Sequence, residues 1–186
     1  MQTTFVLLLL SAQGGTGYDT VTVGNDHRER MVAHWLMKSE PSTYSIDDLC
    51  RDGSTPWEGV RNYQARNYMR DEMKVGDLVL FYHSNAEPPG VAGLARVSQS
   101  AYFDRTALDS NSDYFDASAT PENPRWVHVE VAFVEKLSRF VPLTELKNDD
   151  VLFGMEVHRK GSRLSIQRVS EVHFERVVAL GRGHDR

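Results

Sequence analysis

Residues 78–97 read Leu78-Val-Leu-Phe-Tyr-His-Ser-Asn-Ala-Glu-Pro-Pro-Gly-Val-Ala-Gly-Leu-Ala-Arg-Val97. Two apolar runs of strand length, 78–82 and 91–97, stand on either side of the turn-forming triplet Pro88-Pro-Gly90. A second turn, Lys74-Val-Gly-Asp77, leads into the first run. We therefore predict a β-hairpin here, and the other elements are placed around it.

Further strands lie on both sides of this hairpin. Downstream, residues 127–133 alternate with a period of two, which is typical of a strand. One face holds Val127, Val129, Val131 and Phe133, and the other holds His128 and Glu130. Leu164–Val169 is a last strand, and Trp35–Lys38 is a first strand that ends before Pro41.

Capping residues predict three short helices. Ser45, with an acid three residues later, begins a helix that ends at Gly53. Asn62 caps a second helix. Its core stripe is Ala65, Met69 and Met73, and the neighbouring cationic stripe is Arg66 and Arg70. Ser170 caps a closing helix that stops at Gly181, with Val172, Val177 and Leu180 pointing inward.

Residues 104–125 are rich in Asp, Ser, Asn and Pro without periodicity, so we expect a long surface loop, a kind that is often functional. The pattern gives five or six strands and three or four short helices. Because the strands do not alternate strictly with helices, the sequence favours an α+β fold, a compact mixed sheet or small barrel, over a doubly wound sheet.

Composition excludes several classes of protein. The 186 residues are 40% hydrophobic and 25% charged, which fits an ordinary globular protein and not a collagen-like or wholly disordered chain. The single cysteine, Cys50, cannot close an internal disulfide and fits a reducing cytosol. A net charge of -5 excludes a protein that coats nucleic acid by charge alone, although a local basic pocket stays compatible with it.

The first thirty residues differ from the rest. Their apolar run, Phe5–Leu10, is short for a signal peptide and far too short for a spanning helix, and the glycines at 14–17 match no phosphate-loop motif. We interpret 1–30 as a poorly ordered extension or a mis-assigned start, 31–181 as the domain, and 182–186 as a tail.

The densest group of candidate binding residues is Trp57-Glu-Gly-Val-Arg-Asn-Tyr-Gln-Ala-Arg-Asn67. Rings, arginines and amides at a helix start can stack on a planar heterocycle and hydrogen-bond its edge. The structural alternative is that Trp57 is a core residue and the arginines form a solvated helix face. Aromatic and polar residues also meet at three strand ends: Lys38-Ser39-Glu40-Pro41, Tyr82-His83-Ser84 and Pro124-Arg125-Trp126.

Catalytic motifs have little support. A hydrolase would need Cys50 or Ser39 with His34 or His83, but no GxSxG or cysteine-protease signature surrounds them. We expect Cys50 to be a small core residue. The seven histidines show no HxxxH or HExxH spacing, so we expect no catalytic residues, no metal and no cofactor.

Four segments, in order, resemble the EVE domain family: Trp35–Pro41, Trp57–Asn67, Val75–Ser84 and Asn123–Trp126. The likeness covers about residues 33–180. It implies a PUA-like mixed β pseudo-barrel of five or six strands flanked by short helices, with a pocket for a base of nucleic acid. Residues 1–30 and those after Gly181 depart from the family's pattern.

The resemblance also implies which residues line that pocket. Lys38, Ser39 and Trp57 correspond to a Lys-Ser pair and a pocket tryptophan in the related YTH domain. Residues carried over from the EVE motifs are Arg61, Asn62, Tyr63, Gln64, Arg66, Tyr82, His83, Ser84 and Trp126.

Our hypothesis is a non-enzymatic reader of a modified base in DNA or RNA. The base would be held by Trp57 with Trp126 or Tyr82, and edge-read by Ser39, Asn62 or backbone groups, while Arg61, Arg66 and Lys38 hold phosphates. The alternatives are an enzyme acting on a nucleotide, with Cys50 or His83 reactive, and a protein-interaction adaptor. We expect a monomer without membrane association, cytoplasmic, nucleoid-associated in a bacterium or nuclear in a eukaryote.

Overall fold

The computed structural model describes residues 31–184, so the expectations for 1–30 and for 185–186 lie outside the described residues. Its strands are β1 (His34–Ser39), β2 (Ser54–Pro56), β3 (Leu78–His83), β4 (Gly90–Phe103), β5 (Val127–Pro142) and β6 (Ile166–Val169). Its α-helices are α1 (Ile46–Asp52), α2 (Tyr63–Asn67), α3 (Leu143–Asn148) and α4 (Glu171–Gly181). A π-helical turn, η1 (Tyr68–Glu72), continues α2, and short 3₁₀ turns lie at Arg105–Leu108, Asp150–Leu152 and Glu156–His158.

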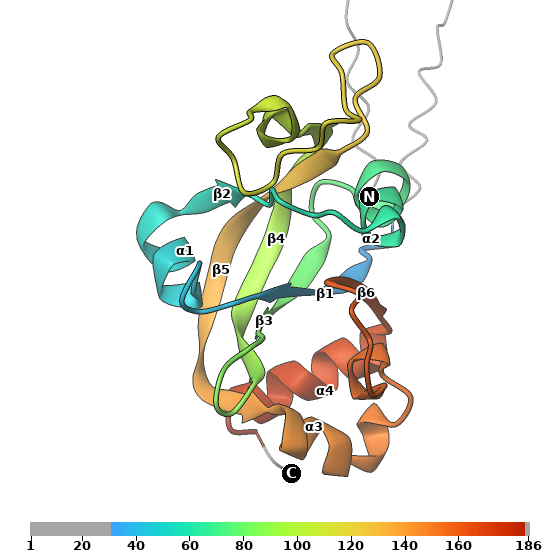
Figure 1. Ribbon diagram of the computed structural model, residues 1–186. Coiled ribbons are helices and arrows are strands. Elements are labelled where there is room, and N and C mark those ends of the chain that lie inside the picture. Colours follow the sequence, from blue (N-terminus) through green and yellow to red (C-terminus); the bar gives the residue numbers. More distant parts are fainter. Residues whose placement is uncertain (1–30, 185–186) are drawn as a thin grey trace, which may run out of the picture. The chain divides into compact units, whose positions relative to one another are not determined.

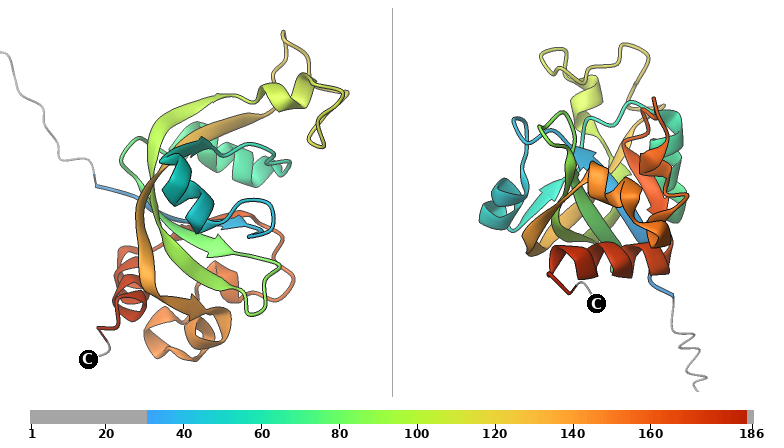
Figure 2. Two further views of the ribbon diagram at one scale, coloured as in Figure 1. Left: turned by 90° about the vertical axis from the view of Figure 1, so that its left-hand side faces the viewer. Right: turned by 90° about the horizontal axis from the view of Figure 1, so that it is seen from below.

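The six strands form one mixed sheet in the order β2-β5-β4-β3-β1-β6 (Figure 1). The predicted β3–β4 hairpin is confirmed, with Leu78 opposite Arg96. Strands β1 and β3 are parallel, and the other neighbouring pairs are antiparallel. Because the β4–β5 ladder shifts register four times, these two long strands bend, and the whole sheet is curved (Figure 2).

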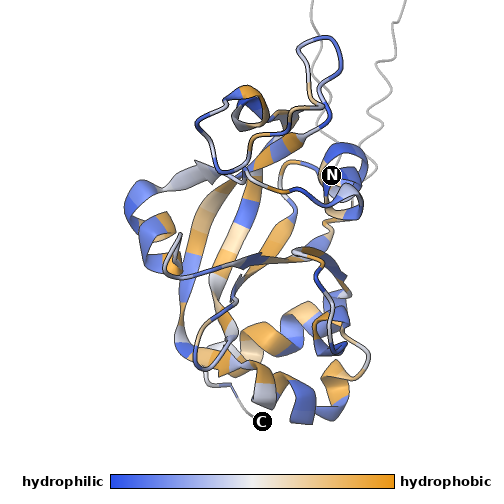
Figure 3. Ribbon diagram, in the orientation of Figure 1, coloured by the Kyte–Doolittle hydropathy of each residue, from blue (hydrophilic) through white to orange (hydrophobic). Residues whose placement is uncertain are grey.

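Two apolar clusters occupy opposite faces of the sheet. Along β3, Phe81 packs with Trp35 and α1 on one face, whereas Leu80 and Tyr82 pack with α4 on the other. The parallel strands are therefore buried on both faces, as continuous apolar runs predict. Figure 3 shows the same pattern, with hydrophobic strands and polar outer helix faces.

Capping confirms the predicted helix starts. The Ser45 and Asn62 side chains accept hydrogen bonds from Asp48 N and Ala65 N, and Ser170 caps α4 by accepting from His173 N. The predicted stripe Ala65, Met69 and Met73 is fully buried. The second helix, however, changes to a π turn after Asn67, because Met73 N donates to Tyr68 O, five residues back.

Three details correct the sequence-based expectations. Val172 is 62% exposed, and Phe174 supplies the inward contact instead. Helix α4 does end at Gly181, but the glycine with a positive φ, +74°, is Gly183; Gly181 is needed for packing, since a Cβ there would lie 2.5 Å from Leu137 Cδ1. Cys50, expected in the core, is exposed, because Ile46 and Leu49 form the inward face of α1.

The segment between β4 and β5 is a long loop, as predicted, with one 3₁₀ turn at Arg105–Leu108. It has a small apolar cluster of its own, made of Ala107, Ala119 and Trp126. Figure 1 places it at the end of the molecule opposite α3 and α4. None of the helices within residues 31–184 is long and apolar enough to cross a membrane.

Candidate ligand-binding site

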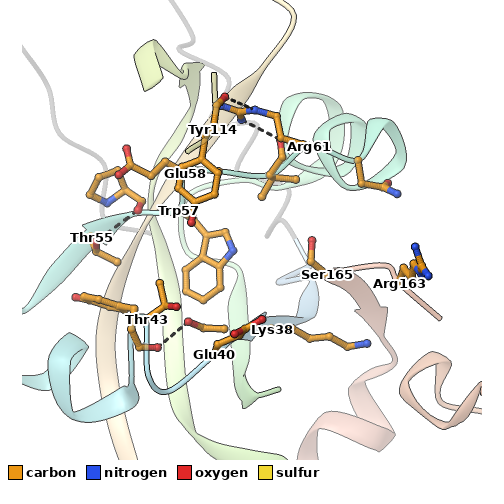
Figure 4. Close-up of a pocket in the computed structure, with 16 residues that line it drawn as sticks. Lys38, Glu40, Thr43, Thr55, Trp57, Glu58, Arg61, Tyr114, Arg163 and Ser165 are labelled. Atoms are coloured by element: carbon orange, nitrogen blue, oxygen red, sulfur yellow. Dashed lines mark hydrogen bonds between the residues drawn. The ribbon is translucent and has the colours of Figure 1, made fainter. Parts of the chain in front are cut away.

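A cavity of about 790 Å³ opens between the end of β1, the segment from β2 to α2, and the loop after β4 (Figure 4). This volume is in the range of about 300–1,000 Å³ that small-ligand pockets occupy. Its wall consists of Lys38, Ser39, Glu40, Thr43, Tyr44, Thr55, Pro56, Trp57, Glu58, Gly59, Val60, Arg61, Asn62, Tyr114, Arg163 and Ser165. Segments far apart in the sequence therefore meet around one space.

Trp57 forms the inner wall. Its backbone N–H donates to Val129 O at 2.8 Å, which continues the β2–β5 ladder. The indole packs edge-on against Phe81, with ring centroids 5.4 Å apart, and the residue is 8% exposed. Trp57 is therefore both a core residue and a pocket residue, which combines the two alternatives that the sequence left open.

Tyr114, from the long loop, supplies another aromatic ring of the wall, above the Trp57 indole in Figure 4, and Tyr44 supplies a third. The hypothesis had given this position to Trp126 or Tyr82, and neither lines the cavity. Tyr82 is 3% exposed on the opposite face of the sheet from Phe81, and Trp126 is held in the loop's own cluster. Tyr114 was missed because its polar surroundings have no periodicity that could indicate where a ring points.

Arg61 holds Tyr114 in place. Its Nε donates to Tyr114 O at 2.8 Å, its Nη2 donates to the same carbonyl, and its Nη1 donates to Asp104 Oδ2 at 2.8 Å. The ring itself lies against Gly59, where a Cβ would be 2.6 Å from Tyr114 Cζ. Gly59 also has φ +77°, so both its conformation and the contact favour glycine.

Asp104 anchors this arrangement from a fully buried position. It accepts hydrogen bonds from Gly59 N, Arg61, Thr106 N and Thr106 Oγ1. Burial acts to raise the pKa of Asp104, but the Thr106 and Arg61 hydrogen bonds and the guanidinium charge outweigh it and hold the pKa below its ordinary value. Asp104 therefore stays a carboxylate.

Glu58, Asp104 and His128 place possible metal-ligand atoms within 4.8 Å of one another. The residues do not fit a metal ion well, because hydrogen bonds from Arg61, Gly59 and Thr106 already occupy both Asp104 oxygens. Burial lowers the pKa of His128, while partial burial, followed by the Asp104 charge, raises the pKa of Glu58. We interpret the group as part of the network that positions Arg61.

Ser39 and Asn62 reach the cavity, but each already makes an internal hydrogen bond. Ser39 Oγ donates to Tyr44 O at 2.6 Å, so this hydroxyl can offer a ligand only its lone pairs. Asn62 Oδ1 caps α2 by accepting from Ala65 N at 3.0 Å, which leaves its NH₂ group as the donor side. Lys38 is half-buried beside them, and burial lowers its pKa.

Seven of the twelve predicted site residues lie outside this wall: Tyr63, Gln64, Arg66, Tyr82, His83, Ser84 and Trp126. Tyr63 stacks on Trp126 with centroids 5.0 Å apart, and Arg66 donates to Arg125 O at 3.0 Å. His83 Nε2 accepts a hydrogen bond from Ile46 N at the start of α1.

Gln64 and Ser84 line two neighbouring cavities, those on either side of the residues before β6. Five of the twelve predicted residues therefore line the main cavity, and the other seven lie in its supports or on adjacent surfaces.

Comparison with known proteins identifies relatives across the whole domain. The family model described as EVE domain matches residues 33–180. Human thymocyte nuclear protein 1 is 39% identical over 176 residues, covering 82% of this chain and 75% of that protein.

Two solved structures are also similar. A hypothetical protein from Leishmania major has 48% identity and a TM-score of 0.79, with 83% of this chain and 98% of that one covered. Human THYN1 protein in complex with 5-methylcytosine containing DNA has 40% identity and a TM-score of 0.74, with 80% and 97% covered.

Proposed function

The chain belongs to the EVE domain family, and its curved mixed sheet is a PUA-like fold, so we propose a non-enzymatic, DNA-binding module that receives one modified base in the Trp57–Tyr114 cavity. The base is swung out of its stack to enter the cavity. The human relative solved with 5-methylcytosine containing DNA supports DNA as the partner and makes 5-methylcytosine the first base to test.

The observation that carries this proposal is the pair of rings at the cavity. Trp57 and Tyr114 come from segments 57 positions apart in sequence, yet both line one space of base-binding size. Stacking on an aromatic side chain contributes about 1–3 kcal/mol per base. Asn62 supplies a donor and Ser39 an acceptor at the rim for the base edge.

The positions of the nucleophiles favour binding over catalysis. The Ser39 hydroxyl donates to a backbone carbonyl and not to a histidine. Cys50 is exposed in the last turn of α1 and does not line the cavity, and the predicted partner His83 accepts from Ile46 N. Alkylating Cys50 should therefore leave DNA binding unchanged.

The test is a fluorescence titration with single-stranded DNA that carries one 5-methylcytosine, beside unmodified DNA and RNA of the same sequence. Tyr114→Ala should weaken binding of the modified strand about 5- to 150-fold, which corresponds to one lost stack. Phe115→Ala is the matched control, because Phe115 is an exposed ring of the same loop that does not line the cavity.

Discrimination should be modest, because excluding one wrong methyl group is worth about 1–3 kcal/mol. Unchanged affinity in Tyr114→Ala would refute the base site, and a preference for the RNA strand would move the proposal from DNA to RNA. The name of the human relative supports a nuclear location if this chain acts in a eukaryote.

A further inference from the structure

The arginines that the sequence suggested for phosphate binding are already engaged. Arg61 donates to Asp104, Tyr114 O and Thr106, and its side chain is 23% exposed. Arg66 donates to Asn67 and to Arg125 O. Of the three cations that the sequence suggested, this leaves Lys38, which is half-buried and whose pKa burial lowers, so a strand whose base enters the cavity needs further cations for its phosphates.

Such cations lie beside the cavity, in the loop before β6. This basic loop, Arg159-Lys-Gly-Ser-Arg163, has three cationic side chains within five residues, all exposed. Arg163 lines the main cavity, and Arg159 and Lys160 line both neighbouring cavities, of about 500 and 300 Å³. Arg168 and Lys147 also lie in the walls of those two cavities. Arg168 pairs with Glu72, and Arg159 pairs with Glu156 at 3.1 Å, so Lys160 and Arg163 are the cations of the loop that make no ion pair within the described residues.

The opposite flank of the cavity is acidic. There, Thr43 and Tyr44 lead into α1, which carries Asp47, Asp48 and Asp52 against one cation, Arg51. Arg51 pairs with Asp48 at 2.7 Å, and Lys136 pairs with Asp47 at 2.6 Å, so these two cations are already engaged by carboxylates. Hydrogen bonds from Ser45 lower the pKa of Asp48 to about 2, so it remains charged at neutral pH. Figure 4 shows the two sides, with Thr43 and Thr55 on one side of the Trp57 indole and Arg163 on the other.

We propose that the basic loop binds the phosphates on only one side of the flipped base, so that the strand leaves the cavity in a single direction. This proposal rests on the proposed function. Opposite charges attract the strand over residues 159–163, while on the other flank Arg51 and Lys136 are held by the carboxylates of α1 and do not offer phosphates a free cation. The partner is single-stranded DNA, or a locally opened duplex, with phosphates required on one side of the modified base.

The asymmetry is tested with short oligonucleotides that carry the modified base at the 5′ end, at the 3′ end or in the middle. An oligonucleotide with the modified base at one of its two ends should bind as tightly as the oligonucleotide with the base in the middle. The oligonucleotide with the base at the other end should bind about as weakly as the free nucleotide. Equal affinities for the two end positions would overturn the proposal.

The loop itself is tested by the triple variant Arg159→Gln, Lys160→Gln and Arg163→Gln. For single strands each lost phosphate contact reduces the slope of log K against log salt by about 0.7, so the slope should fall by about 2. The control, Lys74→Gln, Arg96→Gln and Arg182→Gln, removes the same charge from exposed residues that line none of the three cavities. A slope that stays at the wild-type value, or that falls as much in the control, would overturn the role of the loop.

Failure of this inference is distinguishable from failure of the base site. The loop variant should keep the affinity ratio between modified and unmodified strands, because that ratio depends on the cavity. Tyr114→Ala should reduce the ratio and keep the salt slope. A loop effect without any base preference would therefore reject the base site alone.

Discussion

Arg61 and Asp104 are 43 residues apart, and the guanidinium of one donates to the buried carboxylate of the other at 2.8 Å. The same guanidinium donates to the carbonyl of Tyr114. This ion pair therefore connects the segment before α2 to the long loop and fixes the second ring of the cavity. The arginine, which the sequence suggested as a phosphate contact, positions a residue of the site.

Asp104→Asn should lower the free energy of unfolding by about 3 kcal/mol, because it leaves a largely buried guanidinium without its counter-charge. It should also weaken binding of the modified strand, since Tyr114 loses its support. Chemical denaturation and titration measure the two effects. Asp113→Asn, an exposed acid in the same loop, is the control, and an equal loss of stability there would contradict this role for Asp104.

Gly59→Ala should affect binding more than the fold. The new Cβ would overlap the Tyr114 ring, which can rotate away, while the positive φ costs about 1–2 kcal/mol of stability. Gly154→Ala is the matched control, because Gly154 has φ +88° and a Cβ added there would meet open space. Both variants should lose similar stability, and only Gly59→Ala should lose affinity. Wild-type binding by Gly59→Ala would show that the position of Tyr114 is unimportant.

Asn62 variants separate helix capping from ligand binding. Asn62→Ala removes the acceptor for Ala65 N and should cost about 1 kcal/mol of stability. Asn62→Asp keeps the cap and should keep the stability, but it adds a negative charge at the rim and should weaken DNA binding. Thermal unfolding and titration of both variants check this. Undiminished affinity in Asn62→Asp would exclude Asn62 from the contact with the base.

Stability should fall on mild acidification because of one buried and two partly buried histidines. Burial lowers the pKa values of His83, His128 and His158, so the unfolded chain binds protons near pH 6.5 that the folded chain does not. This stabilisation is complete above the unfolded pKa of about 6.5 and is lost as pH falls toward 5. The limiting slope is about 1.4 kcal/mol per pH unit for each histidine.

His128 is a good test of this effect, because both its ring nitrogens are buried without a hydrogen-bond partner in the described structure. His128→Gln should reduce the pH slope of the unfolding free energy between pH 7 and 5. Tyr102→Phe changes the ring that packs on His128, with centroids 4.1 Å apart, but keeps the titrating group and should keep the slope. The same slope in His128→Gln and wild type would contradict the prediction.

Most of the fold could be predicted because its signals are local. Ser45, Asn62 and Ser170 mark helix starts by hydrogen bonds within one turn, and the triplet 88–90 joins two strands that pair with each other. Element lengths were predicted less well. Strands β4 and β5 extend to Phe103 and Pro142, since the end of each pairs with the beginning of the other through bulges that no periodicity indicates.

The amino-acid order determines the hairpin, the capped helices, the family motifs and Trp57 as a pocket residue, because each depends on neighbours along the chain or on a motif. It does not determine which rings join Trp57 in the cavity wall, or where the cations gather. Tyr114 and the basic loop 159–163 reach the cavity from segments far apart in sequence. The position of Tyr114 depends on Arg61, which pairs with Asp104, and the position of the loop depends on long-range packing. Both form only when the curved sheet brings those segments together.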